Sequence, residues 1–377
     1  MIPRLAFFVS IACASACGAR SELIEPRAPT DAGIVDAPAV SDGCGPLSAT
    51  PTELATFGTP SVVGGGGLDP IQLVVAGGAV YVEVLDTSGS PHSIERVPLA
   101  GGASTTMLTG TAGCNTSPFN VAPLVSDGTY LYTVDTEAAG CSGYPRHVTA
   151  LDLADGSVRT LPDPLDGPDV RVFGIVASSD RAGALWLSQD QYAAMPSANL
   201  VRWDGTSASI LGTMPGLGVD FVAAGDAGFE ETYHDLFSIP LGDRTPTATR
   251  IEATTIDTFQ FVAMNHRAVF HTNGGDTIAR RDAVTGADSI VVTRGAMTRA
   301  RFARAGWADD DWLYYFAGTT TASLARVPER GGATETIWSD PHRQLVAVTS
   351  DACSIYWLVG RTFSPAEHAP ALMGRRR

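Results

Sequence analysis

The chain has 377 residues, of which 44% are hydrophobic and 17% charged, and these proportions are those of a folded globular protein rather than a disordered one. Its net charge of −15 disfavours a nucleic-acid partner, because the phosphate backbone would be repelled. The 40 glycines and 24 prolines favour many short strands joined by tight turns.

The first residues predict an export signal. Arg4 precedes the apolar run Leu5–Ala12, which is too short to span a bilayer as a helix. Ala14-Ser15-Ala16 then precedes Cys17, and two interpretations are open. Residues 1–16 are an ordinary signal peptide cut before Cys17, or they end in a lipobox that makes Cys17 the lipidated N-terminus. A lipobox usually has Leu where this chain has Ala14.

The segment that follows favours lipidation of Cys17. Residues 17–45 are rich in Ala, Pro and Asp and predict a flexible tether. A tether is useful between a lipid anchor and a folded domain. We therefore expect an exported lipoprotein of the outer membrane or cell surface, with a periplasmic protein as the alternative. Membrane contact would be through the lipid only, and the remaining 46–377 would be one monomeric domain.

A module of strands repeats along 46–377. It begins with an apolar strand, continues through a strand centred on an aromatic residue, and ends in a basic-apolar strand with a Gly-rich turn. Two copies end in Arg96-Val97-Pro98-Leu99-Ala100-Gly101-Gly102 and Arg326-Val327-Pro328-Glu329-Arg330-Gly331-Gly332. A repeat of about 40–50 residues made only of strands is typical of a radial array of sheets. The sequence predicts an all-β, seven-bladed β-propeller of four-stranded antiparallel blades.

The seven blades are counted from their central aromatics. These are Tyr81, Tyr132, Trp186, Phe229, Phe270, Tyr314 and Tyr356. The apolar strand before the sixth aromatic is expected at Phe302–Ala305. Most blades also carry an acid or amide in the first turn, at Asp127, Asp180, Asp226, Asn265, Asp309 and Asp351. Such a series could supply metal ligands, but Asp and Asn also close turns through their own side chains, and the turn interpretation is preferred.

The last module is incomplete, because no fourth strand follows Ala371-Leu372-Met373. An exposed sheet edge would result. Pro51–Phe57 has the composition of a fourth strand and precedes the first blade. We expect this N-terminal strand to close the ring.

The cysteines agree with export to an oxidising compartment. Cys13 leaves with the signal and Cys17 is the anchor, so four remain. We expect disulfides between Cys114 and Cys141, which flank one hairpin, and between Cys44 and Cys353, which would join the ends of the ring. Four unpaired thiols are the alternative.

These repeats resemble those of predicted bacterial lipoproteins with propeller domains, across about Leu54 to Met373. The segment Cys17–Leu23 is similar to the N-termini of predicted myxobacterial lipoproteins. Both resemblances imply a fold and an anchor, and neither implies a chemistry.

The sequence contains no G-x-S-x-G, H-E-x-x-H, Walker loop or C-x-x-C motif, so we assign no catalytic, cofactor-binding or metal residue. Glu230, Glu231 and His234 are candidates for a site at the channel mouth, with an ordinary loop as the alternative. Asp309-Asp310-Asp311 could bind Ca²⁺, but a solvated turn is favoured. We expect a non-enzymatic binding or scaffold module for a protein, peptide or glycan. The alternative is a propeller lyase, lactonase or glycan hydrolase.

Overall fold

The computed structural model describes only part of the chain. The described residues are 47–57, 68–86, 93–109, 124–135, 147–165, 170–178, 181–190, 197–215, 218–232, 235–241, 246–253, 259–273, 277–293, 306–317, 322–360 and 369–377. The chain consists of two compact units, Met1–Gly43 and Cys44–Arg377, and all described residues belong to the second. Within them, no helix is long and apolar enough to cross a membrane.

The described residues form seven four-stranded antiparallel sheets, which confirms the predicted β-propeller. The strands of blades 1 and 2 are β2 (Leu68–Ala76), β3 (Ala79–Asp86), β4 (Ser93–Pro98), β5 (Thr105–Thr109), β6 (Val125–Ser126), β7 (Tyr130–Asp135), β8 (His147–Asp152) and β9 (Val158–Thr160). Those of blades 3 and 4 are β10 (Val170–Ser178), β11 (Arg181–Asp190), β12 (Ser197–Trp203), β13 (Ala208–Pro215), β14 (Gly218–Ala224), β15 (Ala227–Thr232), β16 (Asp235–Pro240) and β17 (Thr249–Ala253).

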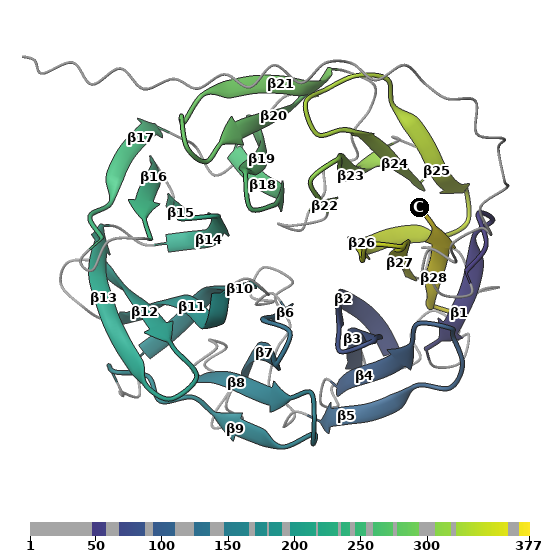
Figure 1. The fold of residues 1–377 in the computed structure, drawn as a ribbon, viewed down its shortest axis with the longest axis horizontal. Helices are drawn as coiled ribbons and strands as arrows, with labels where there is room; N and C mark the ends of the chain where they lie inside the picture. Colours follow the sequence, from purple (N-terminus) through teal and green to yellow (C-terminus); the bar gives the residue numbers. More distant parts are fainter. Residues whose placement is uncertain are drawn as a thin grey trace, which may run out of the picture. The chain divides into compact units, whose positions relative to one another are not determined.

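The remaining three blades follow the same plan. Blades 5 and 6 contain β18 (Phe259–Met264), β19 (Ala268–Asn273), β20 (Thr277–Asp282), β21 (Asp288–Thr293), β22 (Trp307–Ala308), β23 (Trp312–Ala317), β24 (Ala322–Pro328) and β25 (Glu335–Asp340). Blade 7 contains β26 (Gln344–Ser350), β27 (Ser354–Gly360), β28 (Ala371–Arg376) and the N-terminal β1 (Thr52–Thr56). The first strand of each blade lies nearest the ring axis and the fourth lies on the perimeter (Figure 1).

Blade 7 is built from both ends of the described chain. β1 pairs antiparallel with β28, with Thr52 opposite Gly374 and Thr56 opposite Ala371. The Phe57 backbone N–H extends the ladder by donating to the Pro370 carbonyl at 2.8 Å. The β28 edge is therefore covered by a strand from the other end of the sequence.

The core lies in the seams between neighbouring blades. Six of the seven aromatics that define the repeat lie on second strands and pack toward the following blade, as with Tyr81 in the seam between blades 1 and 2. Trp186 is the exception, since it packs back against blade 2, and Leu185 fills the seam toward blade 4. The register of the third repeat was thus predicted one residue too late.

A local irregularity accompanies this difference. The ladder between β10 and β11 shifts between Phe173 and Val176, and Gly174 lies in the shift with a φ of +61°. A Cβ placed on Gly174 would lie 2.4 Å from the Phe221 Cβ. Only glycine fits both that backbone conformation and that close approach of blades 3 and 4. In blade 6, the predicted strand Phe302–Ala305 lies outside the described residues, and β22 is its described first strand.

Candidate functional site

The strand order gives the ring two unlike faces. In blades 1 to 6, the connections between strands one and two and between strands three and four lie at the same end, and in blade 7 the turn between β26 and β27 lies there too. We call this end the turn face, and it includes residues 127–129, 265–267, 309–311 and 351–353. The opposite end, the loop face, carries the connections between strands two and three and between successive blades. Most of those connections lie outside the described residues.

The recurring acids on the turn face close their own turns. The Oδ1 atom of Asp127 accepts the backbone N–H groups of Thr129 and Tyr130, at 2.9 and 2.7 Å. The same arrangement is found at Asn265, Asp309 and Asp351. In each, Oδ1 accepts the backbone N–H groups of the residues two and three positions further along the chain. The turn interpretation of these four residues is confirmed, whereas Asp180 lies outside the described residues.

The second side-chain atom of three of these residues reaches the next blade. Asp127 Oδ2 accepts the Gly183 N–H at 2.8 Å, and Asn265 Nδ2 donates to the Asp309 carbonyl at 2.7 Å. Asp309 Oδ2 lies 2.9 Å from Nη2 of Arg377. Each of these side chains therefore closes a turn and connects two blades at once.

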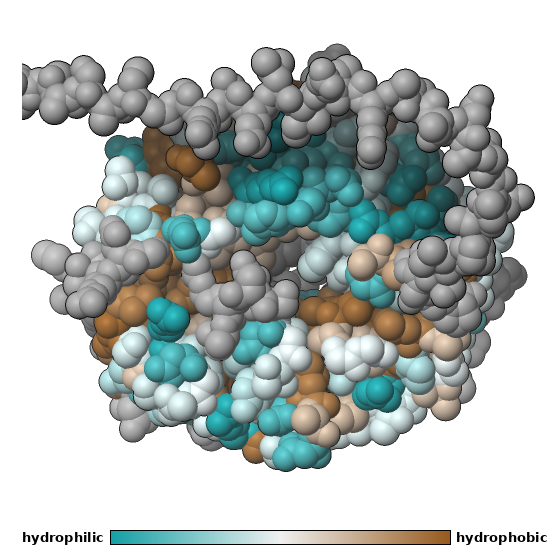
Figure 2. Space-filling model, viewed as in Figure 1, coloured by the Kyte–Doolittle hydropathy of each residue, from teal (hydrophilic) through white to brown (hydrophobic). Residues whose placement is uncertain are grey.

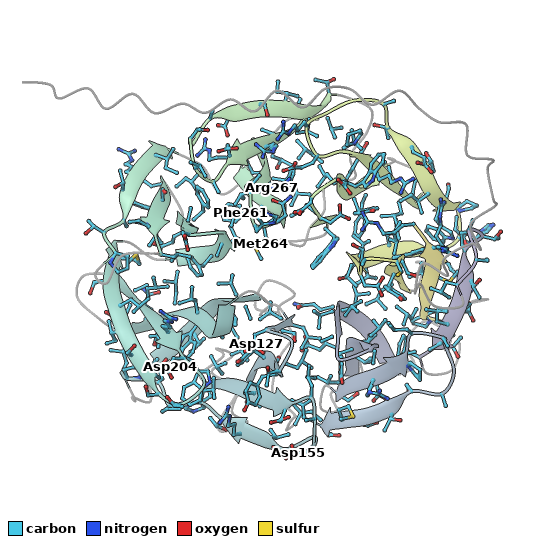
Figure 3. All side chains as sticks on the ribbon, viewed as in Figure 1. Asp127, Asp155, Asp204, Phe261, Met264 and Arg267 are labelled. Atoms are coloured by element: carbon cyan, nitrogen blue, oxygen red, sulfur yellow. The ribbon has the colours of Figure 1, made fainter. Side chains whose placement is uncertain are left out.

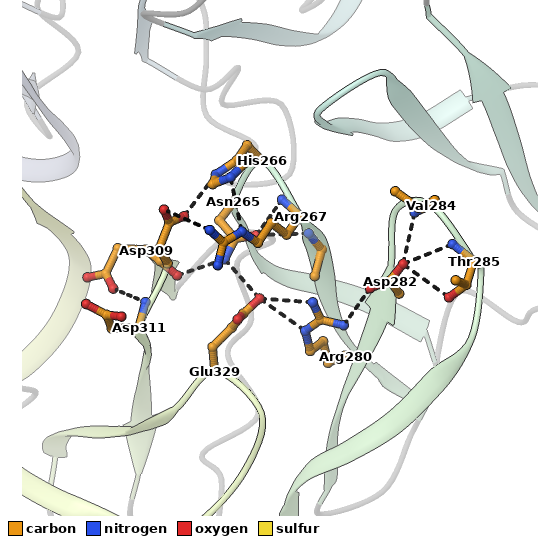
Figure 4. A network of polar contacts seen from close by, with 12 residues as sticks. Asn265, His266, Arg267, Arg280, Asp282, Val284, Thr285, Asp309, Asp311 and Glu329 are labelled. Atoms are coloured by element: carbon orange, nitrogen blue, oxygen red, sulfur yellow. Dashed lines mark hydrogen bonds and ion pairs between the residues drawn. The ribbon is translucent and has the colours of Figure 1, made fainter. Parts of the chain in front are cut away.

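Ion pairs extend this arrangement between blades 5 and 6 (Figure 4). Nε and Nη2 of the buried Arg280 both donate to Glu329 Oε1 at 3.1 Å, and Nη1 contacts Asp282. The backbone N–H of Thr285, the Arg280 side chain and the backbone N–H of Val284 all donate hydrogen bonds to Asp282 and lower its pKa to about 2. These charges are engaged with one another, so they stabilise the seam rather than form an open site.

The most exposed part of the network is a His-Asp-Arg group on the turn face. His266 Nδ1 lies 2.9 Å from Asp310 Oδ1, and Arg267 Nε donates to His266 Nε2 at 3.2 Å. Arg267 and Asp127 lie closer to the ring axis than Asp155 and Asp204, which belong to outer turns (Figure 3). Hydrophilic residues gather over the place of β18 and β19 in this view (Figure 2). Each imidazole nitrogen of His266 thus contacts a side chain, Nδ1 that of Asp310 and Nε2 that of Arg267.

Two glutamates are buried within the seams. Glu83 is 4% exposed and Glu230 is fully buried, and burial raises the pKa of each to about 8. Neither carboxylate oxygen of Glu230 has a hydrogen-bond partner among the described residues. Its partners in the sheet register are Phe221 and Phe237.

The predicted channel-mouth group is only partly described. Glu230 is fully buried. The Glu231 side chain and all of His234 lie outside the described residues, so their convergence with Glu230 stays a prediction.

A hollow opens on the loop face of blade 2. It encloses about 280 Å³ and is lined by His147, Thr160, Leu161, Pro162 and Asp163. His147 begins β8 and Thr160 ends β9, so the antiparallel pairing places both at the same end of the blade. The lining residues of this hollow share no sequence motif, so the sequence does not predict it. The only sequence signal was that a His follows one loop and an Asp precedes the next.

Only some of the residues in the metal and disulfide predictions are among the described residues. Among the described residues, no group of three or more His, Cys, Asp or Glu side chains could hold a metal ion. Asp309 and Asp310, two members of the Asp triplet, are engaged in the contacts above. Cys353 forms a disulfide bond, but the other five cysteines lie outside the described residues. Its pairing with Cys44, and that of Cys114 with Cys141, therefore stay predictions.

No family model and no curated protein matches this chain. Among solved structures, it is similar to a puromycin hydrolase mutant, with a TM-score of 0.57, 12% identity and 86% of this chain covered. The chain spans only 56% of that hydrolase. The likeness shows the propeller fold alone.

Two similar structures match over nearly their whole length. The β-propeller domain of the Trilobed protease from Pyrococcus furiosus has a TM-score of 0.55 at 10% identity, covering 80% of this chain and 92% of that one. An oligogalacturonate lyase in complex with manganese has a TM-score of 0.53 at 14% identity, covering 88% and 98%. Identities this low carry no activity from these proteins to this chain.

Proposed function

We propose that this chain is a surface-anchored, non-enzymatic binding or scaffold protein that recognises a protein, peptide or glycan. One observation supports this proposal above the others, namely the contrast between the two faces of the ring. Turn-face side chains such as Asp127 and Asp309 are engaged in holding blades together. The loop face carries a hollow lined by both polar and apolar residues. Rigid elements that present such groups lose little conformational entropy on binding.

The anchor is part of the same proposal. Lipidation of Cys17 at the start of a tether would hold the ring at the outer membrane or cell surface. The loop face could then meet a partner in the cell envelope.

A photo-crosslinking experiment in cells tests which face meets the partner. A photoreactive amino acid replaces His342, which is exposed on the loop face between β25 and β26. The matched control replaces Asp155, which is exposed on the turn face between β8 and β9. We expect a discrete crosslinked product from position 342 and none from position 155. Equal products from both positions, or a product from position 155 alone, would contradict the proposal.

A further inference from the structure

The hollow of blade 2 is formed by His147, Thr160, Leu161, Pro162 and Asp163 at the loop-face end of β8 and β9. Its volume of about 280 Å³ is at the lower end of ligand pockets, which suits a small ring-shaped ligand. Leu161 forms a buried floor at 1% exposure, and Thr160 is exposed beside it. The Leu161 N–H donates to the Val148 carbonyl at 2.8 Å, so the floor is fixed to the sheet.

Asp163 is held in place by two donors. Trp186 of the next blade donates its indole N–H to Asp163 Oδ2 at 3.1 Å, and the Leu165 N–H donates to Oδ1 at 2.9 Å. Trp186 is fully buried, so this carboxylate is fixed relative to two blades. Each oxygen keeps a further lone pair that can accept a hydrogen bond. The Trp186 orientation that breaks the repeat thus has a local consequence, since it positions an acid in the hollow.

From this geometry we propose that the hollow is a saccharide-binding subsite, an inference that rests on the proposed binding function. Sugar hydroxyls both donate and accept hydrogen bonds, and a fixed carboxylate with a neighbouring hydroxyl offers both roles. The exposed ring of Pro162 supplies an apolar surface for the C–H face of a sugar ring. Asp163 accepts hydroxyl protons, and Thr160 exchanges hydrogen bonds with a neighbouring hydroxyl.

A basic peptide is the main competitor for this site, because a net charge of −15 attracts cations. Salt distinguishes the two ligands. Binding of a neutral sugar by hydrogen bonds and apolar contact changes little with ionic strength, whereas attraction of a peptide to exposed charge is screened.

The experiment titrates the purified full chain with the methyl glycosides of glucose, galactose, mannose and N-acetylglucosamine, and with a triarginine peptide. Ligand-observed NMR measures binding in roughly 50 mM and 500 mM NaCl, concentrations at which screening of exposed charge differs strongly. We expect at least one glycoside to bind with a Kd on the order of 1 mM, the range for a ligand of this size. Its affinity should change less than about twofold with salt.

Three variants locate the binding. Asp163→Asn should weaken it about tenfold or more, because one acceptor of the carboxylate becomes a donor amide. Thr160→Arg should abolish binding by filling the hollow from an exposed position, and it remains informative if Asp163→Asn fails to fold. Asp155→Asn, at the other end of the same hairpin, should change nothing.

The pocket proposal is wrong if no glycoside binds at up to roughly 50 mM, well above the expected Kd. It is also wrong if Thr160→Arg binds as the natural chain does, or if the triarginine peptide alone binds. A captured partner at position 342 without saccharide binding would refute the subsite and leave the binding-module proposal standing. Loss of both would refute both.

Discussion

Replacing Glu230 by Gln should make the protein more stable, and increasingly so as pH rises. Glu230 is fully buried beside Phe221, and neither carboxylate oxygen has a hydrogen-bond partner among the described residues. Burial raises its pKa from the ordinary 4.5 to about 8. The carboxyl group therefore stays protonated in the folded state at neutral pH, whereas in the unfolded chain it is ionised.

The sign of the pH dependence follows from proton binding. Between pH 4.5 and pH 8 the folded state binds more protons at Glu230 than the unfolded state, so the free energy of unfolding falls as pH rises. A pKa difference of this size corresponds to a loss of about 5 kcal/mol at pH 8, as an upper value. At pH 7 the loss is about 3 kcal/mol by the same reasoning.

Glutamine removes this titration while keeping the shape of the side chain. Its own buried amide lacks partners, as the protonated acid does, so we expect the two proteins to be similar at pH 5. At pH 8 Glu230→Gln should be more stable by several kcal/mol, within the upper value of about 5. Glu83 titrates with a similarly raised pKa in both proteins, so their difference isolates Glu230.

Urea denaturation at pH 5, 6, 7 and 8, followed by tryptophan fluorescence, measures the effect. The matched control is Glu329→Gln, because Glu329 is equally buried but paired with Arg280. Removing that charge leaves the buried Arg280 guanidinium with Asp282 alone, so stability should fall, by at most the roughly 3–5 kcal/mol of an uncompensated buried charge. A difference between Glu230→Gln and the natural chain that does not change with pH would refute the reasoning.

Four further predictions follow from the same structure. Asp309→Ala removes two turn hydrogen bonds and the contact with Arg377, and should cost about 2–3 kcal/mol in urea denaturation; a loss no greater than that of Asp155→Ala would contradict the connection between blades. Deleting residues 1–57 removes β1 and should cause aggregation or a large fall in Tm, whereas deleting 1–44 should cost one disulfide only; equal melting would show that β1 is dispensable. Non-reducing peptide mapping should join Cys353 to Cys44, a bridge worth on the order of 4–5 kcal/mol for so long a loop, and any other partner of Cys353 would disprove it. Cys17→Ala should release the protein from the membrane fraction, and its retention there would rule out the lipid anchor.

The fold could be predicted because each repeat has the same types of residue at corresponding positions. An aromatic such as Tyr314 must fill a seam, and an acid such as Asp309 closes the turn before it. The aromatic recurs in all seven repeats and the turn acid or amide in six, so both can be counted. Trp186 gives the wrong register for the third repeat, because an aromatic packs equally well into either seam. Leu185 takes the place toward blade 4, and Trp186 faces blade 2.

The candidate site could not be predicted in the same way. Asp163 and His147 are 16 positions apart, and they meet only because β8 begins at the end of the blade where antiparallel β9 ends. Glu230 and Glu231 are adjacent acids, and on that ground the sequence predicts that they share a site. Alternation along a strand points adjacent side chains to opposite faces, and one face of β15 is the closed seam toward blade 3.

The two faces also differ in what a substitution does. A turn-face residue such as Asn265 satisfies its own turn and a neighbouring blade, so replacing it breaks contacts on both sides of a seam. Thr160, at the loop-face end of β9, has an exposed side chain, and its replacement leaves the seam intact. A new binding specificity can therefore be built on the loop face without loss of the ring. For that reason, variation in function within this architecture should concentrate at loop-face strand ends, such as the start of β8 and the end of β9. Substitutions of the turn acids should mainly change stability.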